Sequence, residues 1–252
     1  EASDIPLFIS VDEEGGAVAR LANKDTFDLP RYESAAAVGA EGVDAACAMG
    51  QTIGAYLKEY GFNMDFAPDA DVNTNPDNPI IGSRAFSSDA GTAAAMAAAA
   101  ADGLRQNGIL PTLKHFPGHG DTAEDSHTAL AATYKTQEEL ANCELLPFGA
   151  DTGLHAVMVG HIAAPNVTGS NTPATLSPQL VAMIPNAEDT LIITDSLAMD
   201  AIADAYTPGE AAVLALQAGC DVLLMPNSLP EAYAAVLEAV QNGTITQERL
   251  DQ

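Results

Sequence analysis

The sequence predicts an α/β protein whose simplest architecture is a (β/α)8-type, TIM-like barrel. Short β-branched segments alternate with helical segments along the chain, as they do when helices cover a parallel sheet. Each predicted strand runs into a polar loop containing glycine or proline, which favours a barrel over an open sheet. No glycine-rich phosphate fingerprint follows any strand, and this disfavours a nucleotide-binding sheet.

The individual elements follow from local signals. Apolar, β-rich runs predict six strands, at residues 5–11, 62–67, 108–113, 155–160, 190–194 and 221–225. Helical periodicity and end signals predict helices at residues 41–59, 90–106, 137–146, 177–183, 208–218 and 230–241. Six strands are fewer than the eight of a closed barrel, and one begins near the first residue. We therefore expect the barrel in this chain to lack its first strand–helix unit.

Composition excludes several classes of function. The net charge of −26 and the scattered cations disfavour nucleic-acid binding. The apolar stretch from Ala93 to Ala101 is too short to span a membrane. Cys47, Cys143 and Cys220 are far apart, so we expect buried thiols rather than disulfides or a metal site. We expect a monomer without a cofactor, and both the bacterial cytoplasm and the cell envelope remain open as locations because a leader could have been removed.

The densest group of reactive side chains lies between residues 114 and 127. Three of the five histidines of the chain fall within it, beside acidic and basic partners: Lys114, His115, His119, Asp121, Asp125 and His127. Paired prolines and glycines exclude a helix, so we predict a shaped loop directly after the strand at residues 108–113. Catalytic residues of α/β enzymes lie on loops of this kind.

Three interpretations of this loop remain open. His127 could be a general acid/base whose ring is held by Asp125. A metal could instead be bound by His115, His119, Asp121 and His127, although their spacing matches no common metal motif. The loop could also be structural, with imidazoles bonded to buried carbonyl groups. The number of acidic and basic partners favours the first interpretation.

Other strand ends carry charged residues as well. Asp195 follows the strand at 190–194 and could act as a nucleophile, although an aspartate there could equally begin a helix. Asp12 precedes a glycine pair and could bond a polyol, or the segment could be a solvated acidic turn. Arg20, Arg84 and Lys114, three of the nine cations, also lie in such segments, which suggests that they hold a ligand.

Six segments in order resemble glycoside hydrolase family 3, and its β-N-acetylhexosaminidase branch most closely. They are VDEEGG at 11–16, NMDFAP at 63–68, IGSRAF at 81–86, the loop at 114–127, VMVGHI at 157–162 and ITDSL at 193–197. The matches extend over most of the chain. The resemblance implies one catalytic barrel of the N-terminal type of this family over residues 1–252.

The resemblance also implies a mechanism. Asp195 would be the nucleophile of a retaining reaction through a glycosyl-aspartate, and His127, paired with Asp125, would be the acid/base. The substrate would be terminal β-linked N-acetylglucosamine of peptidoglycan fragments or amino-sugar oligosaccharides, with no metal. Residues implied to hold the sugar are Asp12, Arg20, Arg84, Lys114, His115 and, with a less defined role, His161. A phosphorylase, a non-catalytic sugar-binding barrel and a metal-dependent hydrolase remain as alternatives.

Overall fold

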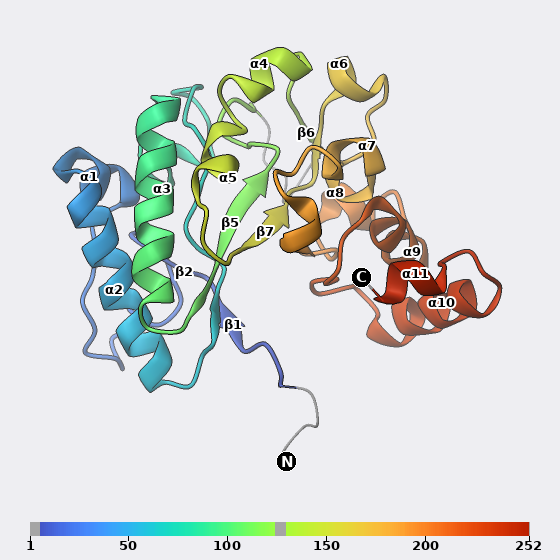
Figure 1. The fold of residues 1–252 in the computed structure, drawn as a ribbon, viewed down its shortest axis with the longest axis horizontal. Coiled ribbons are helices and arrows are strands. Elements are labelled where there is room, and N and C mark those ends of the chain that lie inside the picture. Colours follow the sequence, from blue (N-terminus) through green and yellow to red (C-terminus); the bar gives the residue numbers. More distant parts are fainter. Residues whose placement is uncertain (1–5, 124–129, 252) are drawn as a thin grey trace.

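The computed structural model describes residues 6–123 and 130–251, and its centre is a five-stranded parallel sheet (Figure 1). The strands lie side by side in sequence order: β1 (Ser10–Val11), β4 (Met64–Asp65), β5 (Leu110–Phe116), β7 (Ala156–Val159) and β9 (Leu191–Thr194). All four pairings are parallel, so the carboxyl ends meet at one edge. An order without reversal is that of a barrel wall rather than of a doubly wound sheet. The described strands therefore form a partial TIM-like barrel.

The sixth predicted strand is reduced to a single bridge. Val222 pairs in parallel with Ile193 of β9, so it continues the same order. Residues 221–225 make only this one bridge and are not a strand in the structure. Two short ladders lie outside the main sheet: the antiparallel β2 (Glu13–Gly15) and β3 (Val18–Ala19), and the parallel β6 (Ala131–Ala132) and β8 (Ile162–Ala163). Strands this short have no readable periodicity, which is why the sequence did not predict them.

Helices cover the outer face of the sheet (Figure 1). The helices of the described residues are α1 (Ala35–Glu41), α2 (Val43–Glu59), α3 (Ala90–Arg105), α4 (Gln137–Ala141), α5 (Leu146–Ala150), α6 (Pro165–Thr168), α7 (Pro178–Val181), α8 (Asp200–Ala203), α9 (Pro208–Ala218), α10 (Leu229–Gln241) and α11 (Gln247–Asp251), with 3-10 turns η1 (Gly82–Arg84), η2 (Ala174–Leu176) and η3 (Ala187–Asp189). The long helices α2, α3, α9 and α10 confirm the predictions. Their ends are well marked, since Asp89 caps α3 and Thr207 begins a capping box at α9.

The helix predicted at residues 137–146 is wrong, because the segment forms two helices, α4 and α5. Pro147 has no N–H for the carbonyl group of Cys143, so a continuous helix cannot pass through it. The same proline suits the first turn of α5, where no intrahelical donor is needed.

The predicted loop after residue 113 is also wrong at its start, because β5 continues through Phe116. The Lys114 carbonyl accepts the N–H of Ala70 at 2.7 Å, and the Phe116 carbonyl accepts that of Gly160 at 2.8 Å. Pairing on both sides therefore keeps the strand extended up to Pro117. Lys114 and His115 lie on the strand, where the neighbouring strands hold them in place, rather than on a free loop.

Strand side chains divide between the inside of the partial barrel and the helices outside. The inner cluster consists of Met64, Phe66, Ala156, Met158 and Ile193. Residues of alternate register, such as Val157 and Ile192, pack outward against α3, α5, α7 and α9. The alternation is that of a strand buried on both faces.

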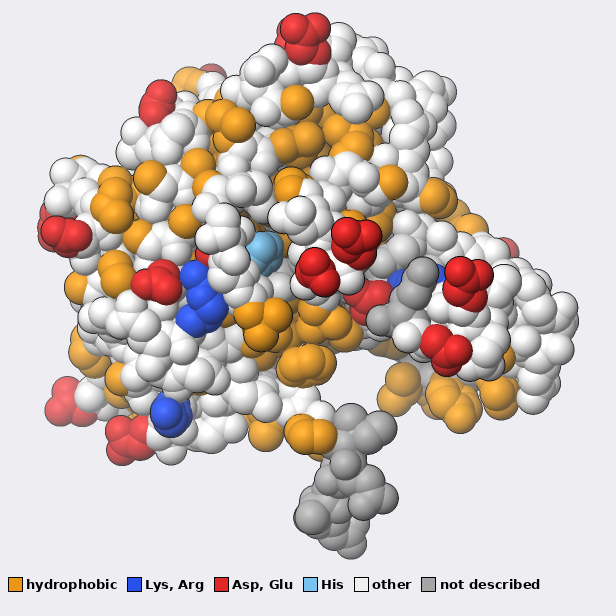
Figure 2. Space-filling view, viewed as in Figure 1, with side chains coloured by type: hydrophobic (Ala, Val, Ile, Leu, Met, Phe, Trp, Pro, Cys, Tyr) orange, Lys and Arg blue, Asp and Glu red, His pale blue; other side chains and the backbone are white. Residues whose placement is uncertain are grey.

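The protein is acidic, with a net charge of −26. Acidic side chains are spread over the face that Figure 2 shows. Across residues 6–123 and 130–251, none of the helices is both long enough and apolar enough to cross a bilayer.

We expect Gly50→Ala to destabilise the protein by about 1–3 kcal/mol, because a Cβ there would overpack the α2–α3 contact. That Cβ would lie 2.1 Å from the carbonyl oxygen of Ala100 on α3. Helix propensity alone predicts the opposite sign, by roughly 1 kcal/mol. Urea unfolding measures the difference. The control is Gly91→Ala on α3, whose Cβ would come no nearer than 3.6 Å to other residues. Equal effects of the two substitutions would contradict the packing argument.

Candidate active site

A pocket of about 310 Å³ opens at the carboxyl ends of the sheet strands. Seven residues that the sequence singled out line it: Asp12, Arg20, Arg84, Lys114, His115, His119 and Asp195. They follow or end β1, β5 and β9 or lie on the connections between strands. An apolar side is formed by Phe66, Met158, Met199 and Leu224. The parallel sheet thus brings together residues from distant parts of the sequence.

A buried carboxylate, Glu14, joins two cations of the pocket. Lys114 Nζ lies 2.7 Å from Glu14 Oε1 and 2.8 Å from Asp12 Oδ1, and the lysine side chain is only 2 % exposed. Arg84 donates to both oxygens of Glu14, at 2.9 and 2.8 Å. Burial alone would raise the pKa of Glu14, but Lys114 and Arg84 lower it to about 2. Glu14 is therefore a permanent anion at neutral pH.

The acidic segment after β1 is therefore not a solvated turn. Glu13 is fully buried and accepts the N–H groups of Leu21 and Ala22 at 2.8 Å, and the hydroxyl of Tyr56 at 2.9 Å. These contacts fix the chain after β3 against α2, while Glu14 points to the pocket. Glu14 was not among the predicted site residues, since the sequence did not reveal which of the two glutamates, Glu13 or Glu14, faces the pocket.

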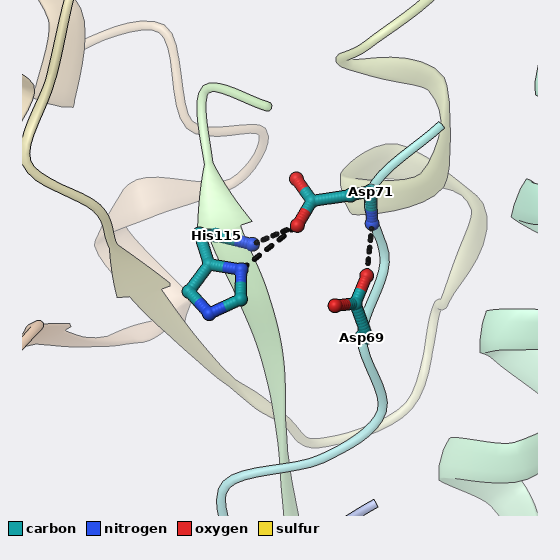
Figure 3. Close-up of side chains that lie close together, drawn as sticks. All are labelled: Asp69, Asp71 and His115. Carbon is teal, nitrogen blue, oxygen red and sulfur yellow. Dashed lines mark hydrogen bonds and ion pairs between the residues drawn. The ribbon is translucent and has the colours of Figure 1, made fainter. Parts of the chain in front are cut away.

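His115 is held by the buried Asp71, which is in turn bonded to the buried Asp69 (Figure 3). Its Nδ1 lies 2.8 Å from Asp71 Oδ2, and the N–H of Asp71 donates to Asp69 Oδ1 at 3.0 Å. Burial alone would lower the pKa of His115, but the Asp71 carboxylate raises it. Burial and the nearby Asp71 raise the pKa of Asp69 to about 7. Sequence reasoning missed both aspartates, although each follows a predicted strand, the same signal that identified Asp195.

Asp195 lies at the carboxyl end of β9 and is half-buried in the pocket. Its Oδ1 accepts the N–H of Ser196 at 2.7 Å. Burial alone would raise the pKa of Asp195, but His161, His115 and Lys114 together with the Ser196 N–H lower it. No helix begins at Asp195, because α8 starts at Asp200. The residue is therefore an ionised carboxylate facing the pocket rather than a helix cap.

His161 contacts the backbone next to Asp195. It is fully buried, its Nε2 lies 2.8 Å from the Ser196 carbonyl oxygen, and its Nδ1 lies 2.8 Å from Thr175 Oγ1. Because a carbonyl group only accepts, Nε2 carries a proton. Among the described residues, those that line the pocket do not include His161, and its contact with Ser196 fits a residue that orients the Asp195 loop. Its predicted contact with sugar stays a prediction.

Asp125 and His127, the predicted acid/base pair, lie outside the described residues. His119 and Asp121, the other two candidates from the segment 114–127, are described. His119 lines the pocket, with its Nδ1 2.6 Å from Thr122 Oγ1. Asp121 lies away from the pocket and accepts a hydrogen bond from Thr133 at 2.7 Å.

One group of described residues has the composition of a metal site: Asp69, Asp71 and His115. Arg84 Nη2 lies 3.5 Å from Asp69 Oδ2 and 3.4 Å from His115 Nε2. The guanidinium thus already places positive charge between these groups, and His115 Nδ1 faces Asp71. The arrangement fits a charge network better than metal ligation.

The model of the glycosyl hydrolase family 3 N-terminal domain matches residues 1–252. The chain belongs to glycoside hydrolase family 3. Curated relatives include β-hexosaminidase A of Pseudoalteromonas piscicida, 33 % identical over 98 % of this chain and 46 % of the relative. β-Hexosaminidase LpqI of Mycobacterium tuberculosis is 35 % identical over 98 % of this chain and 66 % of its own length.

Solved family 3 structures share the fold. A family 3 β-N-acetylglucosaminidase from a Paenibacillus species matches with a TM-score of 0.91 and 39 % identity, over 98 % of this chain and 48 % of that protein. A family 3 member from Mycobacterium smegmatis gives 0.88 and 35 %, over 98 % of this chain and 79 % of that one. The chain thus spans about half to two thirds of the length of the curated relatives described above.

We expect the Asp71–His115 pair to stabilise the family 3 fold in a defined pH window. The raised pKa of His115 makes its contribution full below about pH 6.5 and lost as pH rises through the folded value. The lowered pKa of Asp71, where the His115 charge outweighs burial, makes its contribution full above about pH 4 and lost as pH falls further. Stabilisation by the pair should therefore be largest between these limits.

Urea unfolding of the wild type and Asp71→Asn across this range measures the effect. The difference in unfolding free energy should reach about 3 kcal/mol between these limits and shrink above them. Asp77→Asn, at an exposed position of the same connection, is the control and should change little at any pH. A wild-type advantage over Asp71→Asn that stays constant as His115 deprotonates would contradict the pairing.

Proposed function

We propose that the pocket is the active site of a retaining, exo-acting β-N-acetylhexosaminidase that hydrolyses terminal β-linked N-acetylglucosamine. The observation that carries this proposal is Asp195, an ionised carboxylate at the end of a barrel strand, facing a pocket lined by buried, paired charges. A pocket of about 310 Å³ is at the small end for ligands and suits one terminal sugar. The names of the family 3 relatives support the same activity.

Each group has a role in this reaction. Asp195 attacks the anomeric carbon, and the proposed acid His127, oriented by Asp125, protonates the leaving oxygen. The same histidine then removes a proton from the water that releases the sugar. Asp12, Lys114, Arg84 and other charged groups of the pocket bind the sugar hydroxyls and the acetamido group. Because these groups are held by ion pairs, they need little rearrangement when the sugar binds.

Water is favoured over phosphate as the attacking group. A phosphate requires cations that are not already neutralised, but Lys114, Arg84 and His115 each pair with a carboxylate. Of the described pocket cations, Arg20 is the one without a carboxylate partner, and it is exposed at the rim. A neutral sugar fits this pocket better than an anion does. Natural substrates on this proposal are peptidoglycan fragments or amino-sugar oligosaccharides, handled by a monomer.

Asp195→Ala should lower kcat for 4-nitrophenyl N-acetyl-β-glucosaminide by at least about a thousandfold, because no covalent intermediate can form. Initial rates of the purified protein measure this. Asp200→Ala, at an exposed position on α8, is the matched control and should retain full activity. Substantial turnover by Asp195→Ala would exclude the glycosyl-aspartate. A folded wild type that binds N-acetylglucosamine without cleaving any substrate would instead support the sugar-binding alternative.

Turnover by the wild type should be unaffected by chelator or by added phosphate. The physical reasons are that Arg84 supplies the positive charge between Asp69 and His115, and that the buried pocket cations Lys114 and Arg84 are paired with Glu14. Proton NMR of the products distinguishes N-acetylglucosamine from its 1-phosphate and shows the anomer released first. Loss of activity in chelator would favour the metal-dependent alternative, and a 1-phosphate product would identify a phosphorylase.

A further inference from the structure

Outside the pocket, four polar side chains form a cluster that the proposed reaction does not use. We call Asp121, Thr133, Lys135 and Glu144 the basal cluster. Thr133 Oγ1 donates to Asp121 Oδ2 at 2.7 Å, and Lys135 Nζ lies 3.9 Å from the same oxygen. Lys135 also forms an ion pair with Glu144. Lys135 therefore joins two carboxylates that come from different segments.

Two of the four side chains of the basal cluster are buried, while Asp121 and Lys135 are partly exposed. Glu144 and Thr133 are buried, at 0 % and 1 % exposure. Glu144 sits against Gly118, where a Cβ would approach the glutamate side chain to 2.6 Å. A buried carboxylate requires a counter-charge, and Lys135 is the cation paired with Glu144 among the described residues. The position of the Lys135 ammonium is therefore fixed by a buried partner.

The cluster joins the two sides of the segment that holds the proposed acid/base pair. Asp121 precedes residues 124–129, and Thr133 and Lys135 follow them. Cross-linking two points of a chain reduces the conformations open to the residues between them. The Asp121–Thr133 and Asp121–Lys135 contacts thus link the two sides of this segment to each other.

Further contacts fix these ends relative to the proposed nucleophile. The Thr122 carbonyl accepts the side-chain amide of Asn78 at 3.0 Å. After the segment, β6 pairs with β8, and the N–H of Thr133 donates to the Ala163 carbonyl at 2.9 Å. β8 directly follows His161, which contacts the loop of Asp195. The basal cluster therefore belongs to a continuous framework that reaches the nucleophile.

We propose that Lys135 is a positioning residue for the general acid, which it serves by holding Asp121 and Glu144 together without touching substrate. The inference rests on the proposed function, in which His127 is that acid. Proton transfer requires the acid within hydrogen-bond reach of the leaving oxygen, so displacing the ends of its segment weakens the transfer. Lys135 is not on the lining of the active-site pocket, which separates its role from sugar binding.

The dependence of the rate on the leaving group tests this role. A poor leaving group requires protonation, whereas a dinitrophenolate leaves without it. The value of kcat/KM reports the steps up to the first irreversible one, so breakdown of the glycosyl-enzyme does not obscure the comparison. The two substrates are N,N′-diacetylchitobiose and 2,4-dinitrophenyl N-acetyl-β-glucosaminide.

For Lys135→Met, kcat/KM for diacetylchitobiose should fall by about tenfold to a hundredfold, while that for the dinitrophenyl substrate should fall by less than about threefold. Lys135→Arg should restore most of the loss, because it keeps the charge. Lys135→Met leaves Glu144 buried without its cation and could unfold the protein. The double variant Lys135→Met/Glu144→Gln removes both charges, folds more easily, and should show the same selective loss.

Arg105→Met is the matched control for general destabilisation. Arg105 pairs with the buried Asp151 at 2.5 and 2.8 Å where α3 ends, at the amino ends of the strands and away from the pocket. Thermal unfolding should show a loss of stability, while the ratio of the two kcat/KM values should stay that of the wild type.

Two outcomes would overturn the proposal for Lys135. One is an equal fall for both substrates in folded Lys135→Met or in the double variant, and the other is no fall for diacetylchitobiose. Either can occur while the wild type remains active and Asp195→Ala inactive, so the proposed function would stand. If the wild type cleaves neither substrate, the proposed function fails first, and the role of Lys135 fails with it.

Discussion

The ion pairs of Glu14 with Lys114 and Arg84 are the interaction on which the pocket depends. Glu14 comes from β2, Lys114 from β5 and Arg84 from η1, so one carboxylate joins three distant segments. A lysine that is only 2 % exposed could not remain charged without such partners. The pairing therefore makes it possible for the pocket to contain fixed charges at all.

The same pairing explains how so acidic a protein can present a site for a neutral ligand. A net charge of −26 repels anions and does little to an uncharged sugar. Within the pocket, Lys114 and Arg84 are already matched by carboxylates, so they act as oriented hydrogen-bond donors rather than as an attractive field. Asp195 benefits from the charges of His161, His115 and Lys114, which keep it ionised although burial opposes this.

The sequence predicted the barrel class and most of the pocket because these depend on local signals. The capped helices α3 and α9 and the aspartate that ends β9 are of this kind. The extension of β5 to Phe116 was missed, because it depends on hydrogen bonds from Ala70 and Gly160, which lie beyond the ends of the neighbouring strands β4 and β7. Glu14 and Asp71 were missed for a related reason. Their importance comes from Lys114 and His115, partners that only the folded chain brings near.

The position of Asp195 follows from backbone pairing more than from side chains. Its N–H donates to the Val159 carbonyl at 2.9 Å, and the N–H of Leu197 donates to the Leu224 carbonyl at 2.9 Å. The chain on either side of the carboxylate is thus tied to the end of β7 and to the segment at residues 221–225, and His161 contacts the Ser196 carbonyl between them. The position of a carboxylate fixed in this way does not depend on the residues that contact the leaving group. Evolution of the loops can therefore change specificity while β9 keeps the nucleophile in place.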